Sequence, residues 1–243
     1  MKIGQFVLGH QLNSDQINAR LLNYPMATIP DRKINENTSP IGIDRAILFD
    51  DKAYNNREVE LMLGFEGKDS EKNIQKFLSK LDTGGYVDFQ MYSDPDYIYQ
   101  VARLSTATIT RPSYSDSYRE LNMTLSCAPF KYLDSATKTV SVTAGTDTII
   151  TNPTNFNAKP IIKITATGDT SLTVNGKTLN IKGVQKEITL NSELQDAYVQ
   201  EGYTVTNVNN QVSVGAYPIL KPGDNTIKLT SGTANVETRW RTI

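Results

Sequence analysis

The chain has 243 residues, of which 38% are hydrophobic, so it is long enough to form two domains of ordinary size with real cores. Its 25 Lys and Arg against 26 Asp and Glu give a formal net charge of −1, which argues against electrostatic binding to nucleic acid or to an anionic membrane. The one cysteine, Cys127, excludes an intramolecular disulfide and a cysteine metal cluster, as expected of a protein that folds in reducing cytosol.

The first residues, MKIGQFVLGHQLNS, contain a short apolar patch without the apolar core or the small-residue cleavage site of a signal peptide. No apolar run approaches the ~18 residues that a membrane-spanning helix needs. We therefore expect synthesis in the cytoplasm without a signal peptide, and no insertion into a membrane.

In the first half of the chain, apolar and polar residues mainly alternate, as is typical of strands. Strands are predicted over residues 2–8, 26–29, 41–49, 58–65, 86–92, 97–104, 107–110 and 118–126. Turns are expected over residues 50–57 and 93–96, which are rich in Asp and Asn, and a polar loop over residues 113–118. Pro129 cannot donate a backbone hydrogen bond to a ladder, so the last of these strands should end there.

One amphipathic helix is predicted, over residues 69–81. Apolar residues recur there at i, i+3, i+4 and i+7, namely Ile74, Phe77, Leu78 and Leu81. Asp69 or Ser70 is expected to cap the first turn, and Gly84 and Gly85 should end the helix. The apolar stripe must lie on the sheet that the flanking strands build, so residues 1–133 are predicted to form one β domain with a single helix.

From about Leu133 the composition shifts toward Thr, Asn and Val, which places a domain boundary there and a second domain over residues 139–243. Its predicted strands cover residues 139–143, 148–151, 160–166, 171–174, 178–181, 187–190, 211–215, 225–230 and 236–241. Asn175-Gly176 predicts a two-residue hairpin turn, and residues 222–225 predict a second turn. Many short strands with frequent turns are typical of an antiparallel β-sandwich, so the fold class is mainly β.

The sequence nominates no catalytic, cofactor-binding or metal-ligating residue, and the ligand-binding residues are unknown. His10, the sole histidine, is interpreted as a surface residue, and Cys127 as a small buried residue. The carboxylate pairs Asp50-Asp51 and Asp94/Asp96 are interpreted as turn residues, because a calcium site needs more oxygen ligands at regular spacing. We therefore expect a structural or binding protein and not an enzyme.

A carbohydrate-binding module for host cell-wall polysaccharide is the alternative function. Such a module needs an exposed aromatic platform. The second domain offers five aromatic residues, namely Phe156, Tyr198, Tyr203, Tyr217 and Trp240. Trp240 is expected to be part of the core of the sandwich, which leaves this alternative with few side chains.

The order and spacing of several segments resemble the distal tail proteins (Dit) of bacteriophages with long, non-contractile tails. The segments are REVELMLGFEGKDSEKNIQKFLSKL, YVDFQMYSDPDYIYQVARLS, NMTLSCAPFKY, NPTNFNAKPIIKITATGDTSLTVNG, ITLNSELQDAY, YPILKPGDNTIKL and the final WR. The resemblance covers nearly the whole chain. It implies an N-terminal β domain that forms a ring and a C-terminal galectin-like sandwich.

The resemblance also implies a virion protein at the distal end of the tail. Six copies would form a ring, single or stacked, that joins the tail tube to the tail-associated lysin or tip protein. DNA would pass through the ring without specific binding. A receptor-binding protein or a host glycan would be a further partner, although no long inserted arm for a receptor-binding protein is present in the second domain. The same parts occur in phage-tail-derived bacteriocins.

Overall fold

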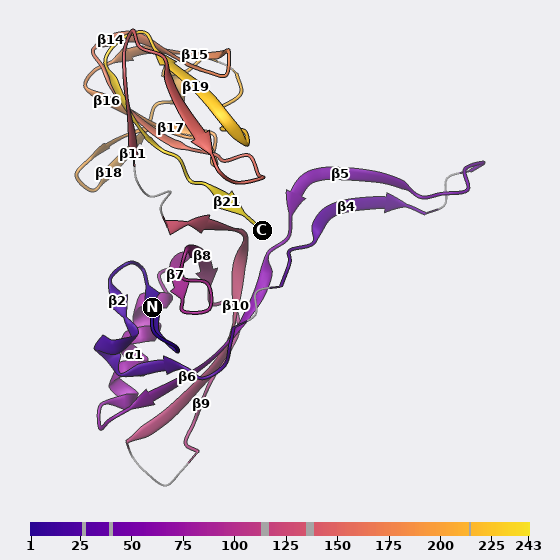
Figure 1. The fold of residues 1–243 in the computed structure, drawn as a ribbon, viewed down its shortest axis with the longest axis vertical. Helices are drawn as coiled ribbons and strands as arrows, with labels where there is room; N and C mark the ends of the chain where they lie inside the picture. Colours follow the sequence, from indigo (N-terminus) through magenta and orange to yellow (C-terminus); the bar gives the residue numbers. More distant parts are fainter. Residues whose placement is uncertain (26–27, 39–40, 113–116, 135–138, 214) are drawn as a thin grey trace. The chain divides into compact units, whose positions relative to one another are not determined.

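The computed structural model describes residues 1–25, 28–38, 41–112, 117–134, 139–213 and 215–243 (Figure 1). The fold over these residues is mainly β, as predicted, and their only α-helix is α1 (Ser70–Leu81). The chain divides into two compact units, Met1–Lys131 together with Ile243, and Tyr132–Thr242.

The first unit is built on one antiparallel sheet with the strand order β2-β1-β7-β8-β10-β6-β3, in which β9 also pairs with β10. Its strands are β1 (Phe6–Leu8), β2 (Leu12–Asn13), β3 (Ala19–Leu21), β6 (Arg57–Glu66), β7 (Val87–Met91), β8 (Tyr97–Ala102), β9 (Ala107–Thr110) and β10 (Tyr118–Leu133). Along β6 and β7 every second side chain is buried, which gives the sheet one face toward the core.

Helix α1 confirms the predicted stripe and packs on that buried face. Ile74, Phe77 and Leu81 are buried with the sheet residues in one core cluster, and Leu78 packs against it while partly exposed. The predicted side-chain cap is wrong. Asp69 makes no capping hydrogen bond with its side chain, and the backbone closes the first turn instead, because the Ser70 amide donates to the Gly67 carbonyl at 3.0 Å.

A two-stranded hairpin formed by β4 (Arg32–Asn37) and β5 (Ile47–Tyr54) extends away from this sheet (Figure 1). The sequence predicted a strand over residues 41–49 and a turn over 50–57. The strand instead begins at Ile47 and runs through Asp50 and Asp51, and only residues 55–56 separate it from β6. Since both faces of the hairpin are exposed, no alternation of apolar and polar residues marks its ends.

Four further predictions for the first unit need correction. Strand β1 begins at Phe6 and not at residue 2, and β8 ends at Ala102. Residues 28–29 lie outside any strand, while 26–27 and most of the predicted loop, residues 113–116, lie outside the described residues. Strand β10 continues past Pro129 to Leu133, because its ladder with β6 ends at the pair Cys127–Arg57, so the proline removes no donor from that ladder.

The second unit is a sandwich of two antiparallel sheets. One has the order β11-β20-β13-β16-β17-β18 and the other β12-β19-β14-β15. The first contains β11 (Thr139–Thr143), β13 (Ile161–Thr165), β16 (Glu187–Asn191), β17 (Asp196–Glu201), β18 (Thr204–Asn207) and β20 (Thr233–Glu237). The second contains β12 (Thr148–Asn152), β14 (Gly168–Val174), β15 (Lys177–Val184) and β19 (Gly223–Leu229). One buried cluster draws on both sheets, as two inner faces packed together require.

The predicted hairpin of the second unit is confirmed, since Asn175 and Gly176 both have positive φ, 51° and 78°. Residues 211–215 do not form the predicted strand. They follow a 3-10 turn, Asn209–Gln211, and Val212 makes only an isolated bridge with Ile181. Strands β17 and β18 lie outside the predicted strands, and β19 already begins at Gly223, within the predicted turn. The predicted last strand, residues 236–241, is divided: β20 ends at Glu237, and a short strand, β21 (Arg241–Thr242), follows.

Candidate functional surfaces

The described residues place no nucleophile beside a base. His10 is exposed at the surface, and its Nε2 lies 2.7 Å from Asp88 Oδ2. Cys127 is fully buried, and burial raises the pKa of its thiol, which keeps it protonated. The expected surface histidine and buried cysteine are both confirmed. His10 contacts Asp88, and the Cys127 thiol donates to the Ala128 carbonyl oxygen, so the described contacts do not bring the two residues together as a catalytic pair.

In each carboxylate pair that the sequence singled out, one carboxylate contacts a nearby cation. Asp50 accepts two hydrogen bonds from Arg32, at 3.0 and 2.6 Å, and this contact lowers the pKa of the carboxyl group. Asp94 lies in a turn, as predicted, and accepts hydrogen bonds from the Tyr99 hydroxyl and Lys131 Nζ, both at 2.6 Å. In the part of the chain that the structure describes, no three His, Cys, Asp or Glu residues gather in a way that could hold a metal ion.

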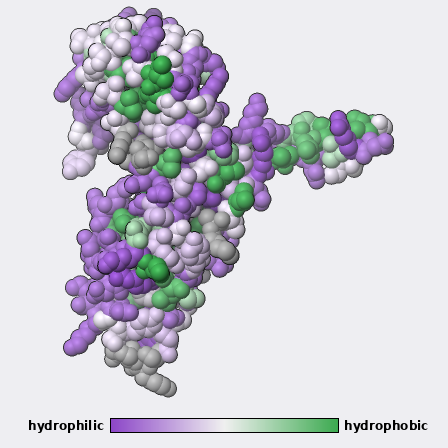
Figure 2. All heavy atoms as spheres, viewed as in Figure 1, coloured by the Kyte–Doolittle hydropathy of each residue, from purple (hydrophilic) through white to green (hydrophobic). Residues whose placement is uncertain are grey.

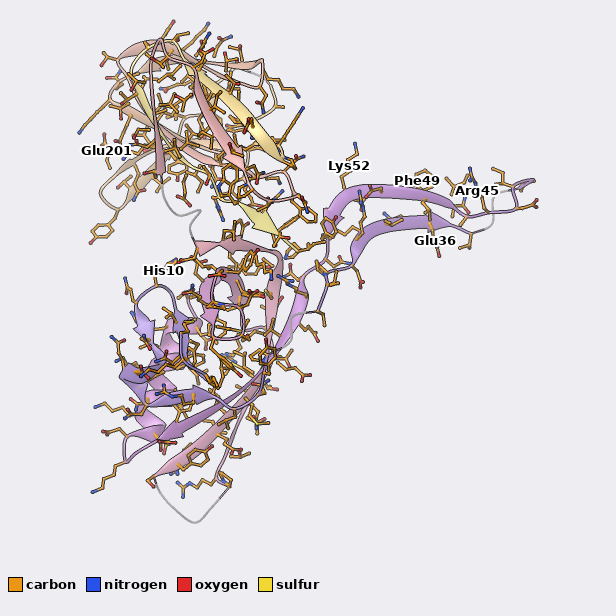
Figure 3. The ribbon with its side chains drawn as sticks, in the orientation of Figure 1. His10, Glu36, Arg45, Phe49, Lys52 and Glu201 are labelled. Carbon is orange, nitrogen blue, oxygen red and sulfur yellow. The ribbon has the colours of Figure 1, made fainter. Side chains whose placement is uncertain are left out.

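The β4–β5 hairpin carries the first candidate surface. Its exposed apolar side chains, here called the apolar hairpin surface, are Ile34, Ile41, Ile43, Ile47, Leu48 and Phe49. Leu48 is 61% exposed and Phe49 57%. Figure 2 shows apolar residues gathered along the hairpin, and Figure 3 shows Glu36 and Phe49 on its two strands.

Apart from Tyr54 at its base, whose ring packs edge-on against Phe130 at 5.6 Å, neither face of this hairpin is covered by other described residues of the chain. Successive side chains of a strand point to opposite faces, so Leu48 and Phe49 lie on different faces, opposite Glu36 and Asn35. The base is anchored, because Arg32 pairs with Asp50 there. A two-stranded hairpin alone is only marginally stable in water, and this one exposes apolar side chains on both faces. In the single chain, the hairpin therefore presents apolar side chains to water on both faces.

The second candidate surface is a groove of about 520 Å³ on the exposed face of the six-stranded sheet of the second unit. A row of side chains crosses it from strand to strand, because Asn235 pairs with Lys163, Lys163 with Thr189, and Thr189 with Tyr198. Their chain neighbours, such as Ile162, Ile164 and Ile188, are buried in the core on the other face. The row is therefore a product of strand register, since its members are far apart in sequence.

Among the five aromatic residues that the sequence offers over residues 139–243, only Tyr198 lines this groove. Trp240 belongs to the core and is 8% exposed, as predicted. Tyr203 is fully exposed in the turn between β17 and β18, two residues after Glu201, the last residue of β17 (Figure 3). Tyr217 is half-buried and donates to Asn209 Oδ1 at 3.0 Å. Sequence reasoning named Tyr198 but could not place it in a row with residues of other strands.

A buried polar cluster lies within the second unit. The Tyr132 hydroxyl donates to Glu193 Oε2 at 3.0 Å, and Arg241 Nη1 contacts the other oxygen of Glu193 at 3.3 Å. Arg239 stacks over the Tyr132 ring at 4.7 Å. Burial, followed by the charge of Glu193, raises the pKa of Tyr132 to about 12. Because every member is paired, this cluster is interpreted as structural.

None of the described residues forms a helix with the length and apolar character that crossing a bilayer requires.

The chain is similar to known proteins in its structure, and not detectably in its sequence. No protein-family model and no curated protein sequence matches the chain. The crystal structure of the SPP1 Dit (gp 19.1) protein, described as a paradigm of the hub adsorption apparatus in phages that infect Gram-positive bacteria, is similar with a TM-score of 0.65 and 14% identity, over 97% of this chain and 98% of that one. A chain of the phage P2 baseplate in its activated conformation with Ca is similar with a TM-score of 0.56 and 11% identity, over 97% and 98%. The chain therefore has a Dit-like fold, as the sequence resemblance implied.

Proposed function

We propose that this chain is a structural hub protein at the distal end of a phage tail, and that it has no enzymatic activity. One observation carries the proposal: the likeness to the SPP1 Dit protein extends over 97% of the chain, so it includes both units and not a common sandwich alone. The described residues support a structural role in a second way, because the titratable groups singled out from the sequence are buried, paired or exposed singly.

The hub acts as a ring of six copies. The apolar hairpin surface of one copy packs on the first unit of the next, which would cover side chains that the single chain leaves in water. Such a contact joins two different patches, and it closes into a ring when the rotation between neighbours is right. The two edge strands of the sheet, β2 and β3, are only two and three residues long. Pairing of a neighbouring copy's strand with either edge would therefore supply few hydrogen bonds, and the hairpin contact is favoured.

The ring joins the tail tube to the tail-associated lysin or tip protein and lets DNA pass. A formal net charge of −1 supports passage without tight binding, because affinity for the phosphate backbone depends on an excess of Lys and Arg. The protein is then made in the host cytoplasm and ends in the virion. The N-terminal unit forms the ring, and the C-terminal unit is the galectin-like sandwich.

The hairpin contact is tested by comparing the mass of the wild-type chain in solution with that of the double variant Leu48→Ser/Phe49→Ser. The variant should run as a monomer with an unchanged melting temperature, because both side chains are exposed in the single chain. Ile149→Ser is the matched control, since Ile149 is 66% exposed on β12, outside the hairpin, and its variant should keep the wild-type mass. A double variant that assembles like the wild type would remove the hairpin from the contact.

A further inference from the structure

We propose that the groove on the six-stranded sheet of the second unit is a binding site for a neutral oligosaccharide. This site goes beyond the hub role and does not rest on it. The groove has a volume of about 520 Å³ and is lined mainly by polar side chains of β13, β16, β17 and β20.

The row Asn235–Lys163–Thr189–Tyr198 matches an extended ligand. Neighbouring strands lie about 4.8 Å apart, so a row that crosses four strands spans roughly 14 Å. All four side chains stand on one face, because each pair lies directly opposite in the strand register. A ligand that contacts the whole row must therefore run across the strands and present polar groups at regular intervals, as a chain of sugar rings does.

The hydrogen-bonding groups in the groove are open to a ligand. Within the described residues, the Tyr198 hydroxyl and Thr189 Oγ1 make no hydrogen bond to protein, and neither group is on the core side of the sheet. Asn235 accepts a hydrogen bond from Ser141 Oγ at 2.9 Å, which fixes its amide and points to a pre-organised donor. Sugar hydroxyls both donate and accept, so they suit this mixture of hydroxyl and amide groups.

The charges in the groove favour a neutral ligand. Lys163 Nζ lies 2.9 Å from Glu187 Oε2, so the one lysine of the lining is already paired with a carboxylate. The other charged lining residue, Glu237, is also an acid. Among the described lining residues, an anionic ligand would meet no lysine or arginine that is not already paired, which makes a phosphate or a uronic acid a poor match.

Tyr198 supplies the apolar part of the site. The ring is half-buried, so it is held by its surroundings while one part stays accessible in the groove. Sugar rings have an apolar C–H face, and an aromatic ring offers a flat surface on which such a face can lie. Ligand sites generally combine such an apolar wall with a few well-placed polar groups.

The test is binding of the full chain to a microarray of neutral and acidic bacterial oligosaccharides, followed by calorimetric titration with the neutral glycan that binds best. Tyr198→Ala should weaken that affinity about tenfold, which corresponds to ~1.4 kcal/mol. Thr189→Val keeps the side-chain shape and removes only the hydroxyl, so it is the second variant in case Tyr198→Ala does not fold, and it should weaken binding about fivefold. Tyr203→Ala is the control and should bind like the wild type, because Tyr203 does not line the groove.

Two kinds of result would overturn the proposal. If the wild-type chain binds no glycan on the microarray, or binds acidic glycans only, a neutral glycan site is excluded. Affinity that is lost in Tyr203→Ala and kept in both groove variants would place the site elsewhere. The mass of each variant in solution is measured in parallel: a change of assembly in the groove variants would show that the groove is a protein contact, whereas failure of the hub role alone would leave the glycan binding unchanged.

Discussion

Phe77 of α1 packs edge-on against Phe6 of β1, with the ring centroids 5.7 Å apart and the rings inclined at 79°. Phe77 also contacts Phe65 of β6, at 6.3 Å. All three side chains are fully buried. One helical residue thus links two strands that are separated in the sheet order, and the position of the helix on the sheet depends on it.

Replacing Phe77 by alanine should cost ~3–5 kcal/mol of unfolding free energy, because the change leaves a cavity where two aromatic contacts meet. The yield of soluble protein should fall accordingly. Urea unfolding measures the loss, with Leu78→Ala as the control, since Leu78 is next in the helix and only partly buried. Equal losses in the two variants would contradict the assignment of Phe77 as the anchor of the helix.

Comparing alanine substitutions at Gly232 and Gly145 separates two costs to stability: the strain of a positive φ and the steric clash of an added Cβ. Both have similar positive φ, 83° and 80°, so alanine is strained at either position. A Cβ at Gly232 would lie 2.2 Å from the Thr165 carbonyl oxygen, whereas a Cβ at Gly145 meets nothing within 4 Å. Gly232→Ala should therefore destabilise the protein by at least about 2 kcal/mol more than Gly145→Ala in urea unfolding. Similar values for both would mean that the space around Gly232 adds no cost.

Tyr132 should make the protein lose stability in alkali. Its pKa is about 12 in the folded chain and about 10 when unfolded, so the unfolded state releases the proton first as the pH rises. The stabilising contribution is complete below pH ~10 and is lost between about pH 10 and 12, on the order of 1–3 kcal/mol. The free energy of unfolding is compared at pH 9 and pH 11 for the wild type and Tyr132→Phe. The variant, which has no hydroxyl to ionise, should lose less between the two values; identical losses would contradict the prediction.

The sequence was sufficient for the elements whose pattern reflects burial. The stripe of Ile74 and Phe77 located α1, and the alternation over residues 58–65 located β6 to within one residue at each end, because each of these faces a core. The exposed hairpin was the main failure. Strand β4 reads RKINEN and is exposed throughout, so no pattern of burial could mark it. Strand β5 was misplaced for the same reason.

The candidate surfaces were harder to predict than the fold. Tyr198 was identified as an aromatic residue, but its position beside Thr189 and in line with Lys163 follows from strand register across three strands. Such pairing depends on contacts between distant parts of the chain. The exposed apolar side chains from Ile41 to Phe49 fall within the strand predicted over residues 41–49, whereas Ile34 lies outside every predicted strand. Sequence alone does not distinguish an apolar residue of a core from one that is exposed in the single chain.

The most direct test of the hub account is the mass of the purified full chain by light scattering, together with negative-stain images of the same sample. The account predicts six copies in a closed ring with an open centre. A monomer at every concentration measured, or an open chain of variable length, would contradict it.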